Sequence, residues 1–528
     1  MERISFIGKL KKWINENKII ILLSLLFFFI RLPFLDQFNL LHDERDISLS
    51  GYSIARTGKD LSGVYFPLSI SNIAPDNPLV SIYYSALWWL IPLPKTVFNA
   101  RLPFVFITSF LVVLIYSLIA FIVKDKRKAL LTTLVCCFSP WLFHLTRLSM
   151  DIGIAFMTLI VAITLQAKKN KFAYVFYILT FYNYQGFRVL IPFIIFYVSF
   201  FFENGTNIKK ALLINIVFLI FLFGSIQVID KNITLNRFNQ IIFLNKTHFD
   251  NQIIFNRNTS LAPASIKALF DNKIVAPINY VITGLIKGQD ITYLFKDGDY
   301  SAINGSISGG QFLFPLIIFY YLGIVSLGKK CDKNSLFIIG LIPLGMLPAL
   351  VSLNGTSFAI RGITSSIGYS FLIAGGITTF TSFMRSQNKP LLVIGVFSIL
   401  GILFSVSLSY FIYTYYFRRP VLVGEMFNEN ERKVSEYIIG RQDKEQIIVA
   451  SNSPKDLSRS YLFFLNTQAV NTPVFIDCKE LKMKKAIQNT IILASYDCIN
   501  DGRFYGRAAD ATIGFSDYSN RTAYYIFE

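Results

Sequence analysis

Eleven long apolar stretches constrain the fold of this chain more than any other feature. About 20 apolar residues cross a bilayer as a helix, and shorter stretches do so when they are tilted or covered by neighbours. Hydrophobic residues make up 53% of the 528 residues and charged residues only 16%, which excludes an ordinary soluble protein. We therefore expect a mainly α-helical, polytopic membrane protein. The predicted spans are 18–35, 102–123, 129–143, 148–167, 172–183, 189–202, 211–229, 312–327, 335–353, 363–383 and 390–416.

Basic residues fall in alternate loops between these stretches and predict the orientation. Lysine and arginine gather on the cytoplasmic side of membrane proteins, so these loops and the N-terminus are predicted to be cytoplasmic. The odd number of spans then places segments 36–101, 230–311 and 417–528 outside a plasma (inner) membrane. This topology explains the formal net charge of +19, and we expect no nucleic-acid partner because no basic stretch carries interleaved stacking residues. The basic residues are Lys9, Lys11, Lys12, Lys18, Lys124, Lys126, Arg127, Lys128, Lys168, Lys169, Lys171, Lys209, Lys210, Lys329, Lys330, Lys333, Arg385 and Lys389.

The chain divides into a membrane module, 1–416, and a small extracytoplasmic domain, 417–528. A charged helix-like piece and short β-rich runs follow the last apolar span, a pattern typical of an α/β domain. Cys478 and Cys498 lie in this domain and could pair if it faces an oxidising compartment. The predicted elements are a helix over Glu429–Ile439 and strands at Ile447–Ala450, Tyr461–Leu465, Val474–Ile476, Ile491–Ala494 and Tyr524–Phe527.

The two outer segments within the membrane module differ in character. The first holds an aromatic-rich, helix-compatible stretch, Pro78–Pro92, which suits the membrane interface. The second combines short amphipathic pieces with a Gly/Ser-rich stretch, Gly305–Gly310. That stretch lacks the Lys-Ser/Thr of a phosphate-binding loop, so we expect a mobile cover.

Adjacent acidic residues follow the first span. Asp43 and Glu44 come a few residues after it, preceded by His42. Ionisable groups against the end of a spanning helix indicate a functional site, although acidic residues in a loop can also be simply solvated.

Three arginines lie in short outer turns, where the distribution of positive charge predicts none. They are Arg147, Arg188 and Arg361. Arg147 is four residues before Asp151, so on one helix the two share a face and can pair. Each arginine alone could extend to the interface from a helix end, but three on the side that holds Asp43 favour a function.

Arginines grouped with carboxylates suggest a phosphate-bearing substrate and a proton acceptor. Guanidinium groups bind phosphate oxygens with paired donors, and a partly desolvated carboxylate can act as general base. Polyprenyl-phosphate sugars fit, because their tail needs lipid and their head lies at the outer interface. His42, His144 and His248 are all predicted outside; a divalent metal ion is conceivable there, but no ligand spacing supports it, and ordinary hydrogen bonding is the alternative.

These residues together resemble a known family, the GT-C membrane glycosyltransferases. The group most similar is that of the bacterial relatives of protein O-mannosyltransferases and of the lipid A aminoarabinose transferase, and the resemblance covers roughly residues 20–380. The residues that carry it are Asp43-Glu44, the turn Gly58-Lys59-Asp60, Ser139-Pro140 with Arg147 and Asp151, Tyr184 with Arg188 and Pro192, and the late arginine Arg361.

The resemblance implies the transfer of one sugar from a polyprenyl-phosphate donor to an acceptor hydroxyl, outside the membrane and with inversion. It implies Asp43 as the base with Glu44 beside it, and Asp151 as the second acidic position, paired with Arg147. The C-terminal tail resembles the extra outer domain of some members. The inserted sugar-binding-type domain of the mannosyltransferases has no counterpart here, which weakens a protein acceptor relative to a glycan or lipid hydroxyl.

Three alternatives remain at this point. A flippase or exporter of lipid-linked sugars would carry polar groups along its spans and on both sides, whereas here they collect outside. A non-catalytic scaffold presenting 417–528 would leave the outer acids and arginines without a purpose. Within the enzymes, an oligosaccharide ligase or oligosaccharyltransferase would use the same groups.

Overall fold

The computed structural model describes residues 15–70, 78–229, 246–307, 309–329, 331–352, 358–387, 389–441, 446–465, 472–481, 490–499, 502–504, 507–514 and 521–528. Several residues of the sequence predictions lie outside these ranges. They are Lys9, Lys11, Lys12, Ser308, Lys330 and the segment 354–357 that precedes Arg361.

Each of the eleven predicted spans contains a helix in the structure. Within the described ranges, six helices are long and apolar enough to cross a membrane, and three shorter apolar helices accompany them. The chain is therefore a multi-pass membrane protein, although fewer helices reach full crossing length than the sequence predicts. The helices that overlap the eleven predicted spans, of which α5 and α6 together make one of the six long helices (Val97–Val123), are α2 (Lys18–Phe29), α5 (Val97–Thr108), α6 (Leu111–Val123), α7 (Lys126–Cys137), α9 (Asp151–Ala167), α10 (Ala173–Phe181), α11 (Gln185–Phe202), α12 (Thr206–Ile229), α17 (Leu316–Lys329), α18 (Lys333–Leu350), α20 (Ser365–Arg385) and α21 (Pro390–Tyr413).

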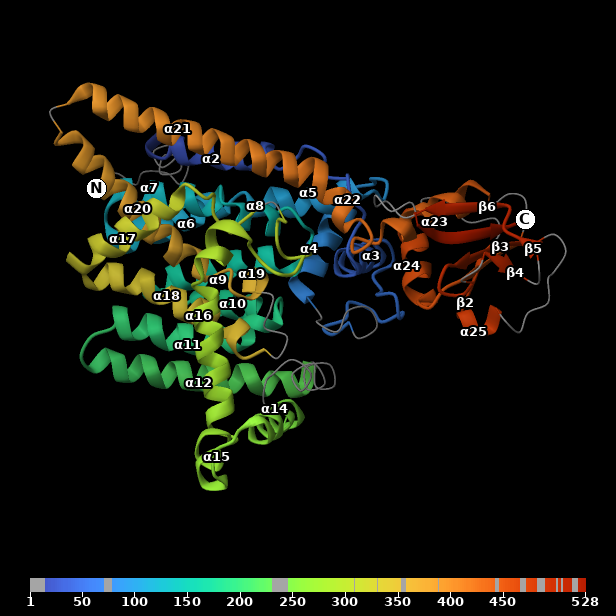
Figure 1. Ribbon diagram of the computed structural model, residues 1–528, viewed down its shortest axis with the longest axis horizontal. Coiled ribbons are helices and arrows are strands. Elements are labelled where there is room, and N and C mark those ends of the chain that lie inside the picture. The colour runs from blue at the N-terminus through green and yellow to red at the C-terminus, as the bar shows by residue number, and fades with distance from the viewer. Residues whose placement is uncertain are drawn as a thin grey trace, which may run out of the picture.

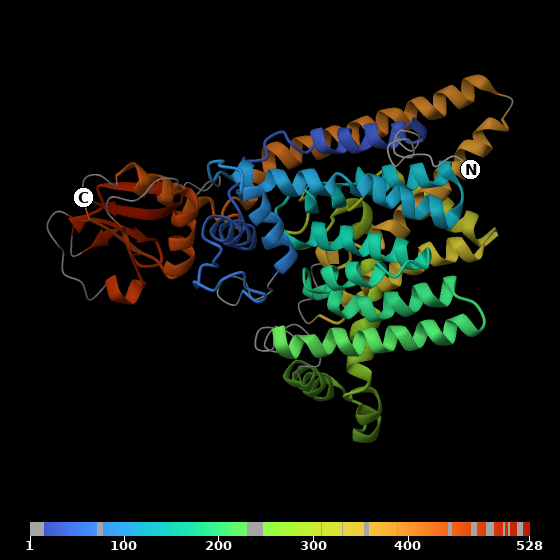
Figure 2. The ribbon, with the colours of Figure 1, turned by 180° about the vertical axis from the view of Figure 1, so that it is seen from behind.

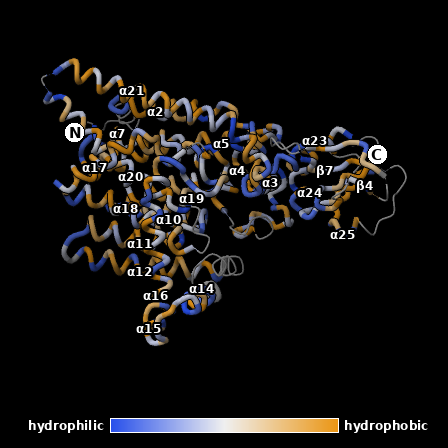
Figure 3. The backbone as a smooth tube through the Cα atoms, in the orientation of Figure 1, coloured by the Kyte–Doolittle hydropathy of each residue, from blue (hydrophilic) through white to orange (hydrophobic). Residues whose placement is uncertain are grey.

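These helices form one bundle, and the C-terminal domain lies at one of its ends (Figures 1 and 2). Hydrophobic residues run along α21, α11 and α12 (Figure 3). Helices α17 and α20 pack backbone to backbone: a Cβ at Gly323 would lie 1.9 Å from the carbonyl oxygen of Leu372, and one at Gly376 would lie 1.8 Å from that of Phe319. Small residues allow this close approach of membrane helices.

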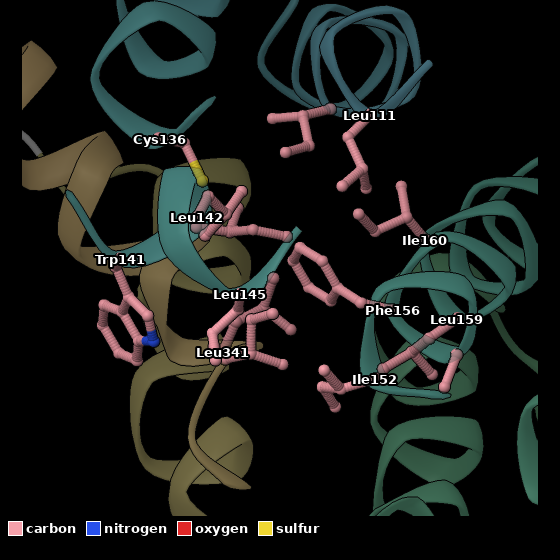
Figure 4. Packing of buried hydrophobic residues seen from close by; sticks show 14 of the residues in the cluster. Leu111, Cys136, Trp141, Leu142, Leu145, Ile152, Phe156, Leu159, Ile160 and Leu341 are labelled. Atoms are coloured by element: carbon pink, nitrogen blue, oxygen red, sulfur yellow. The ribbon is translucent and has the colours of Figure 1, made fainter. Parts of the chain in front are cut away.

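The centre of the bundle is a closely packed apolar core. Leu111 of α6, Phe156 and Ile160 of α9 and Leu142 of the short helix α8 are fully buried, and their side chains point toward one another (Figure 4). This packing fixes the ends of α8 and α9, where the candidate site residues lie.

The shorter helices lie near the end of the bundle that carries the C-terminal domain or, like α16, run across the bundle. The aromatic-rich stretch predicted at Pro78–Pro92 is helix α4, and the amphipathic pieces of the second segment are α14 to α16. Figure 1 shows α16 running across the direction of α11 and α12. These elements are α3 (His42–Thr57), α4 (Leu79–Trp89), α8 (Pro140–Leu145), α14 (Lys246–Thr259), α15 (Ala264–Phe270), α16 (Val275–Gly288), α19 (Phe358–Arg361), α22 (Arg419–Val423) and the π-helical turns η1 (Thr292–Lys296) and η2 (Thr414–Arg418).

The C-terminal domain contains a five-stranded sheet in the order β2-β1-β3-β7-β6. Strand β1 is parallel to both neighbours, with Ile448 opposite Val474 on one side and Ile492 on the other. The pairs β3–β7 and β6–β7 are antiparallel. The strands are β1 (Gln446–Ala450), β2 (Val474–Ile476), β3 (Thr490–Ser495), β6 (Ala511–Gly514) and β7 (Thr522–Phe527), with a separate pair β4 (Arg503–Phe504) and β5 (Arg507–Ala508).

Helices cover both faces of this sheet. Helices α23 (Glu429–Gly440) and α24 (Pro454–Phe464) pack on one face, and α25 (Cys478–Leu481) packs on the other. The strand predicted at Tyr461–Leu465 is wrong, because most of this run belongs to α24. That helix begins at Pro454, a residue suited to the first helical turn, and its apolar residues pack on the sheet at helical spacing. Cys478 and Cys498 form a disulfide.

The C-terminal domain contacts the bundle mainly through α3. Arg45 is 2% exposed, and its guanidinium pairs with Asp46 at 3.0 Å, with Glu431 of α23 at 3.1 Å and with Asp456 of α24 at 3.4 Å. Arg459 of α24 also pairs with Asp46, at 3.2 Å. These ion pairs fix α3 to the domain.

Candidate active site

A cavity of about 400 Å³ opens where the start of α3, the start of α9 and the short helix α19 meet. Five residues singled out from the sequence line it together, although they come from segments more than 300 residues apart. The lining residues are Leu41, His42, Asp43, Ile47, Pro78, Met150, Asp151, Tyr184, Ile303, Asn304, Ile360, Arg361 and Met426.

Asp43 reaches this cavity from the first turn of α3. The helix begins after Leu41, whose N–H donates to the Glu44 carboxylate at 3.1 Å. It ends at Gly58, which adopts a left-handed conformation (φ 69°) that glycine tolerates best. Asp43 is exposed, and a carboxylate in the first turn is stabilised by the helix dipole. His42, also exposed, lies 3.8 Å from Asp456 and 4.0 Å from Glu431.

Asp151 also lines the cavity, as the first residue of α9. The amide of Asn183 locks this end in place, because its Nδ2 donates to the Asp151 carbonyl at 2.8 Å and its Oδ1 accepts from the Ser81 N–H at 2.8 Å. Three helices, α4, α9 and α10, are thereby held around the cavity. Tyr184, which precedes α11, lines the same wall.

Arg361 contributes the guanidinium group of the cavity. It ends the four-residue helix α19 and donates to the Ser352 hydroxyl. The Asp299 carboxylate holds the start of the same helix, accepting from the N–H groups of Ala359 and Ser301 at 2.7 Å each. Burial raises the pKa of Asp299 to about 6, against the opposing effect of these hydrogen bonds and of the Arg361 charge.

The sequence interpretation missed Asp299. It lies in the loop between η1 and α17, two residues after Asp297, which is exposed. Nothing in the sequence of that loop indicates that Asp299 is buried whereas Asp297 is exposed.

Glu44 has a different environment from that of Asp43 beside it. Its side chain is fully buried, and Arg101 of α5 binds both carboxylate oxygens, at 2.9 and 2.7 Å. The N–H and hydroxyl of Ser149 also donate to it, at 2.7 and 3.0 Å. Burial raises the pKa of Glu44, but Arg101 and the hydrogen bonds outweigh it, so the pKa lies below its usual value. Glu44 does not line the cavity.

Arg147 does not share a helix with Asp151, so that premise of the sequence analysis is wrong. Helix α8 ends at Leu145 and α9 begins at Asp151. Arg147, in the break between them, donates to the carbonyl oxygens of Arg31 and Pro33. It is 2% exposed and lies outside the cavity lining.

The other candidates lie away from the cavity lining. Arg188 donates to the carbonyl of Phe181 at 3.1 Å. The Asp60 carboxylate accepts two N–H groups of its own turn, at 2.9 Å each, and the Lys59 ammonium lies over the ring of Tyr65. His144 contacts Tyr415 and the carbonyl of Ile303. His248 belongs to α14, and its side chain is not among those described.

Among the residues that the structure describes, no group of three or more His, Cys, Asp or Glu side chains could hold a metal ion. The ionisable groups that line the cavity are the carboxylates of Asp43 and Asp151, the guanidinium of Arg361, the imidazole of His42 and the phenol of Tyr184.

Comparison with known proteins identifies structures that have a similar fold, but no similar sequences. No protein-family model matches the chain, and no curated protein matches its sequence. Crystal structures of ArnT from Cupriavidus metallidurans do match in fold. The form bound to undecaprenyl phosphate covers 97% of this chain and 98% of its own, with 11% identity and a TM-score of 0.51. The apo form covers 98% of each chain, with 10% identity and a TM-score of 0.49.

The archaeal oligosaccharyltransferase AglB from Archaeoglobus fulgidus, in complex with an inhibitory peptide and a dolichol-phosphate, is a weaker match. It covers 92% of this chain and 70% of its own, with 11% identity and a TM-score of 0.46. The chain thus has the ArnT-like fold of the GT-C membrane glycosyltransferases, as the sequence predicts.

Proposed function

We propose that this chain is an inverting glycosyltransferase that moves a single sugar from a polyprenyl-phosphate donor to an acceptor hydroxyl, on the extracytoplasmic face of the plasma membrane. The observation that carries the proposal is the cavity itself, which brings Asp43 and Asp151 together with Arg361 at one end of an apolar bundle. The fold shared with ArnT, a protein crystallised with undecaprenyl phosphate, supports the choice of lipid carrier.

In this proposal Asp43 is the general base. It is an exposed acid that lines the cavity, so an acceptor hydroxyl can reach it. The acceptor oxygen attacks the anomeric carbon and its proton passes to the Asp43 carboxylate. The bond between the anomeric carbon and the phosphate oxygen breaks, and polyprenyl phosphate leaves from the opposite face of the sugar, which inverts the configuration.

Arg361 stabilises the departing phosphate. A guanidinium presents paired donors to phosphate oxygens, and donors fixed before the reaction are usually the largest source of catalysis. The Ser352 hydroxyl accepts from Arg361, and Asp299 holds the start of the same short helix through the Ala359 N–H. Asp151 faces the same space from α9 and is suited to bind a sugar hydroxyl or assist the base. Arg147 and Arg188 support the walls through their backbone contacts.

The disulfide between Cys478 and Cys498 supports an extracytoplasmic C-terminal domain, because such bonds persist in oxidising compartments. The cavity lies at the end of the bundle that carries this domain, so donor head group and acceptor would meet outside.

The experiment that tests the proposal uses the purified protein in lipid nanodiscs. It is incubated with a panel of synthetic polyprenyl-phosphate sugars and with membrane extracts as the source of acceptor. The expected result is release of free polyprenyl phosphate, matched by a product with inverted anomeric configuration, and no release by Asp43→Asn. Release from diphosphate-linked oligosaccharides alone would point to an oligosaccharide ligase, and movement of intact lipid-linked sugar between leaflets would point to a flippase.

A further inference from the structure

The C-terminal domain contains a second, larger cavity, of about 660 Å³. It is lined by Ser451–Ser453, which follow β1, by Ser495–Asp497 at the end of β3, and by the start of β7. The segment 425–431, which joins the domain to the bundle, forms another wall.

This position is where the topology of the sheet opens a crevice. From β1 the chain passes through α24 to β2 on one side, and from β2 it returns past α25 to β3 on the other side of β1. The chain leaves the carboxyl end of β1 toward α24 on one face, and it leaves the carboxyl end of β3 toward Cys498 and Ile499, which pack with α25 on the other face, so these two connections diverge there. Ligands of open α/β sheets bind at such points.

The side chains of this cavity are short, polar and aromatic. Asn452 contributes an amide, and serine hydroxyls lie on either side of it. Tyr496 is 46% exposed, and its ring stacks beside that of Tyr525 with centroids 6.5 Å apart. A flat aromatic surface next to several hydrogen-bonding groups suits a sugar ring, which has an apolar face and hydroxyls at its edge.

The charges of the lining disfavour a phosphorylated ligand. Three carboxylates face one guanidinium: Glu425 pairs with Arg521 at 3.2 Å, Glu431 pairs with Arg45, and Asp497 is exposed. A nucleotide or another polyanion would meet net negative charge, whereas an uncharged sugar or an amino sugar would not.

The two cavities share a wall. Met426 lines the cavity of Asp43, while Glu425 and Asn428 line the larger one. Glu431 lines the larger cavity and lies 4.0 Å from His42, which lines the other. The end of a saccharide bound in the larger cavity would therefore lie near the cavity of Asp43.

We infer that the larger cavity is a saccharide-binding site, which holds the non-reacting part of a glycan acceptor. The role as acceptor site rests on the proposed function, whereas the binding of saccharide does not.

Isothermal titration calorimetry on the full chain in nanodiscs tests the inference without any catalysis. Oligosaccharides are titrated from three sets (neutral, N-acetylated amino and acidic), together with one unmodified peptide and one nucleotide, both into the wild-type protein and into Asp43→Asn. Binding of a neutral or amino saccharide to both proteins is expected. Tyr496→Ala and Asn452→Ala should weaken it at least tenfold, with the unfolding temperature unchanged because both side chains are exposed. Tyr496→Phe, which keeps the ring, and the distant surface variant Lys479→Ala should bind nearly as the wild type does.

The outcomes separate the two claims. Saccharide binding that Tyr496→Ala abolishes, in a protein that transfers no sugar, would sustain the binding site and overturn the proposed function. Sugar transfer by a protein that binds no saccharide here, or tighter binding of the peptide or nucleotide in this cavity, would overturn the inference.

Discussion

Two clusters at the same end of the bundle combine a carboxylate with an arginine, yet they differ in what surrounds them. In the first, Arg101 and Ser149 occupy the Glu44 carboxylate, and no part of it is exposed. In the second, Asp43 and Arg361 line an open cavity of about 400 Å³. Adjacent acids of one helix turn thus have opposite environments. Glu44 is thus enclosed by protein partners, whereas Asp43 and Arg361 border a cavity.

The largest expected effect tests the open cluster. Asp43→Asn removes the proposed base and keeps the size of the side chain. We expect transfer to fall by about 10³-fold or more, as when a general base is lost, with unchanged insertion and unfolding temperature. Rates with a defined polyprenyl-phosphate sugar measure this, and Asp36→Asn, at an exposed acid outside the cavity, is the matched control. Near-normal turnover by Asp43→Asn would show that Asp43 is not the base, so that the open cluster would be no more catalytic than the closed one.

The second test concerns the closed cluster. Glu44→Gln leaves the buried Arg101 guanidinium without its counter-charge, which costs about 3–5 kcal/mol of folding stability. Thermal unfolding in detergent measures the loss. Since the pKa of Glu44 lies below its usual value of 4.5, its ionised form stabilises the fold above that pH. This contribution disappears as the pH falls through the lowered pKa, and the variant should lack that pH dependence.

A result with the opposite pattern for Glu44 would be equally informative. If Glu44→Gln unfolded at the wild-type temperature but transferred no sugar, Glu44 would be a reacting group rather than a structural one.

The third test exchanges the arginine of the open cluster. Arg361→Lys keeps the charge and loses the paired donors, so we expect transfer to fall by about 10²-fold, as when one fixed donor to the developing charge is removed. Donor binding should change less than the rate. Arg385→Lys, at an exposed arginine at the end of α20, controls for the substitution. Equal losses for both variants would contradict a specific role for Arg361.

The smallest effect concerns Asp299, which holds α19 behind the open cluster. Because burial raises its pKa to about 6, the carboxylate is ionised above that pH and protonated below it. Its contribution to folding stability is complete below its usual value and is lost as the pH rises through about 6. The charge that attracts Arg361, however, exists only above that pH. We expect Asp299→Asn to transfer sugar a few-fold more slowly at pH 7.5, and the ratio of wild-type to variant rates to shrink toward one near pH 5. A ratio that does not vary with pH would assign Asp299 a purely structural role.

The sequence predicted the helical bundle, most of the sheet, and five residues of the cavity. Apolar stretches and the distribution of basic residues directly predict the membrane segments and their orientation. Polar residues at the outer ends of these segments then lie at the same end of the bundle. The roles of Asp43, Asp151 and Arg361 stay predictions.

The rest depends on tertiary partners that a sequence does not reveal. Whether Glu44 is closed or open is decided by Arg101, 57 residues away. Arg147 was misplaced because the spacing of four assumes one continuous helix, whereas the chain breaks between α8 and α9. The run Tyr461–Leu465 is β-rich in composition, but packing against the sheet and the start at Pro454 make most of it helical.

The attachment of α3 to the C-terminal domain through Arg45 has a practical consequence. The helix that carries Asp43 is clamped by α23 and α24, which belong to the water-facing part of the protein. An antibody fragment that binds those two helices would therefore act on the helix that carries Asp43 without entering the bilayer.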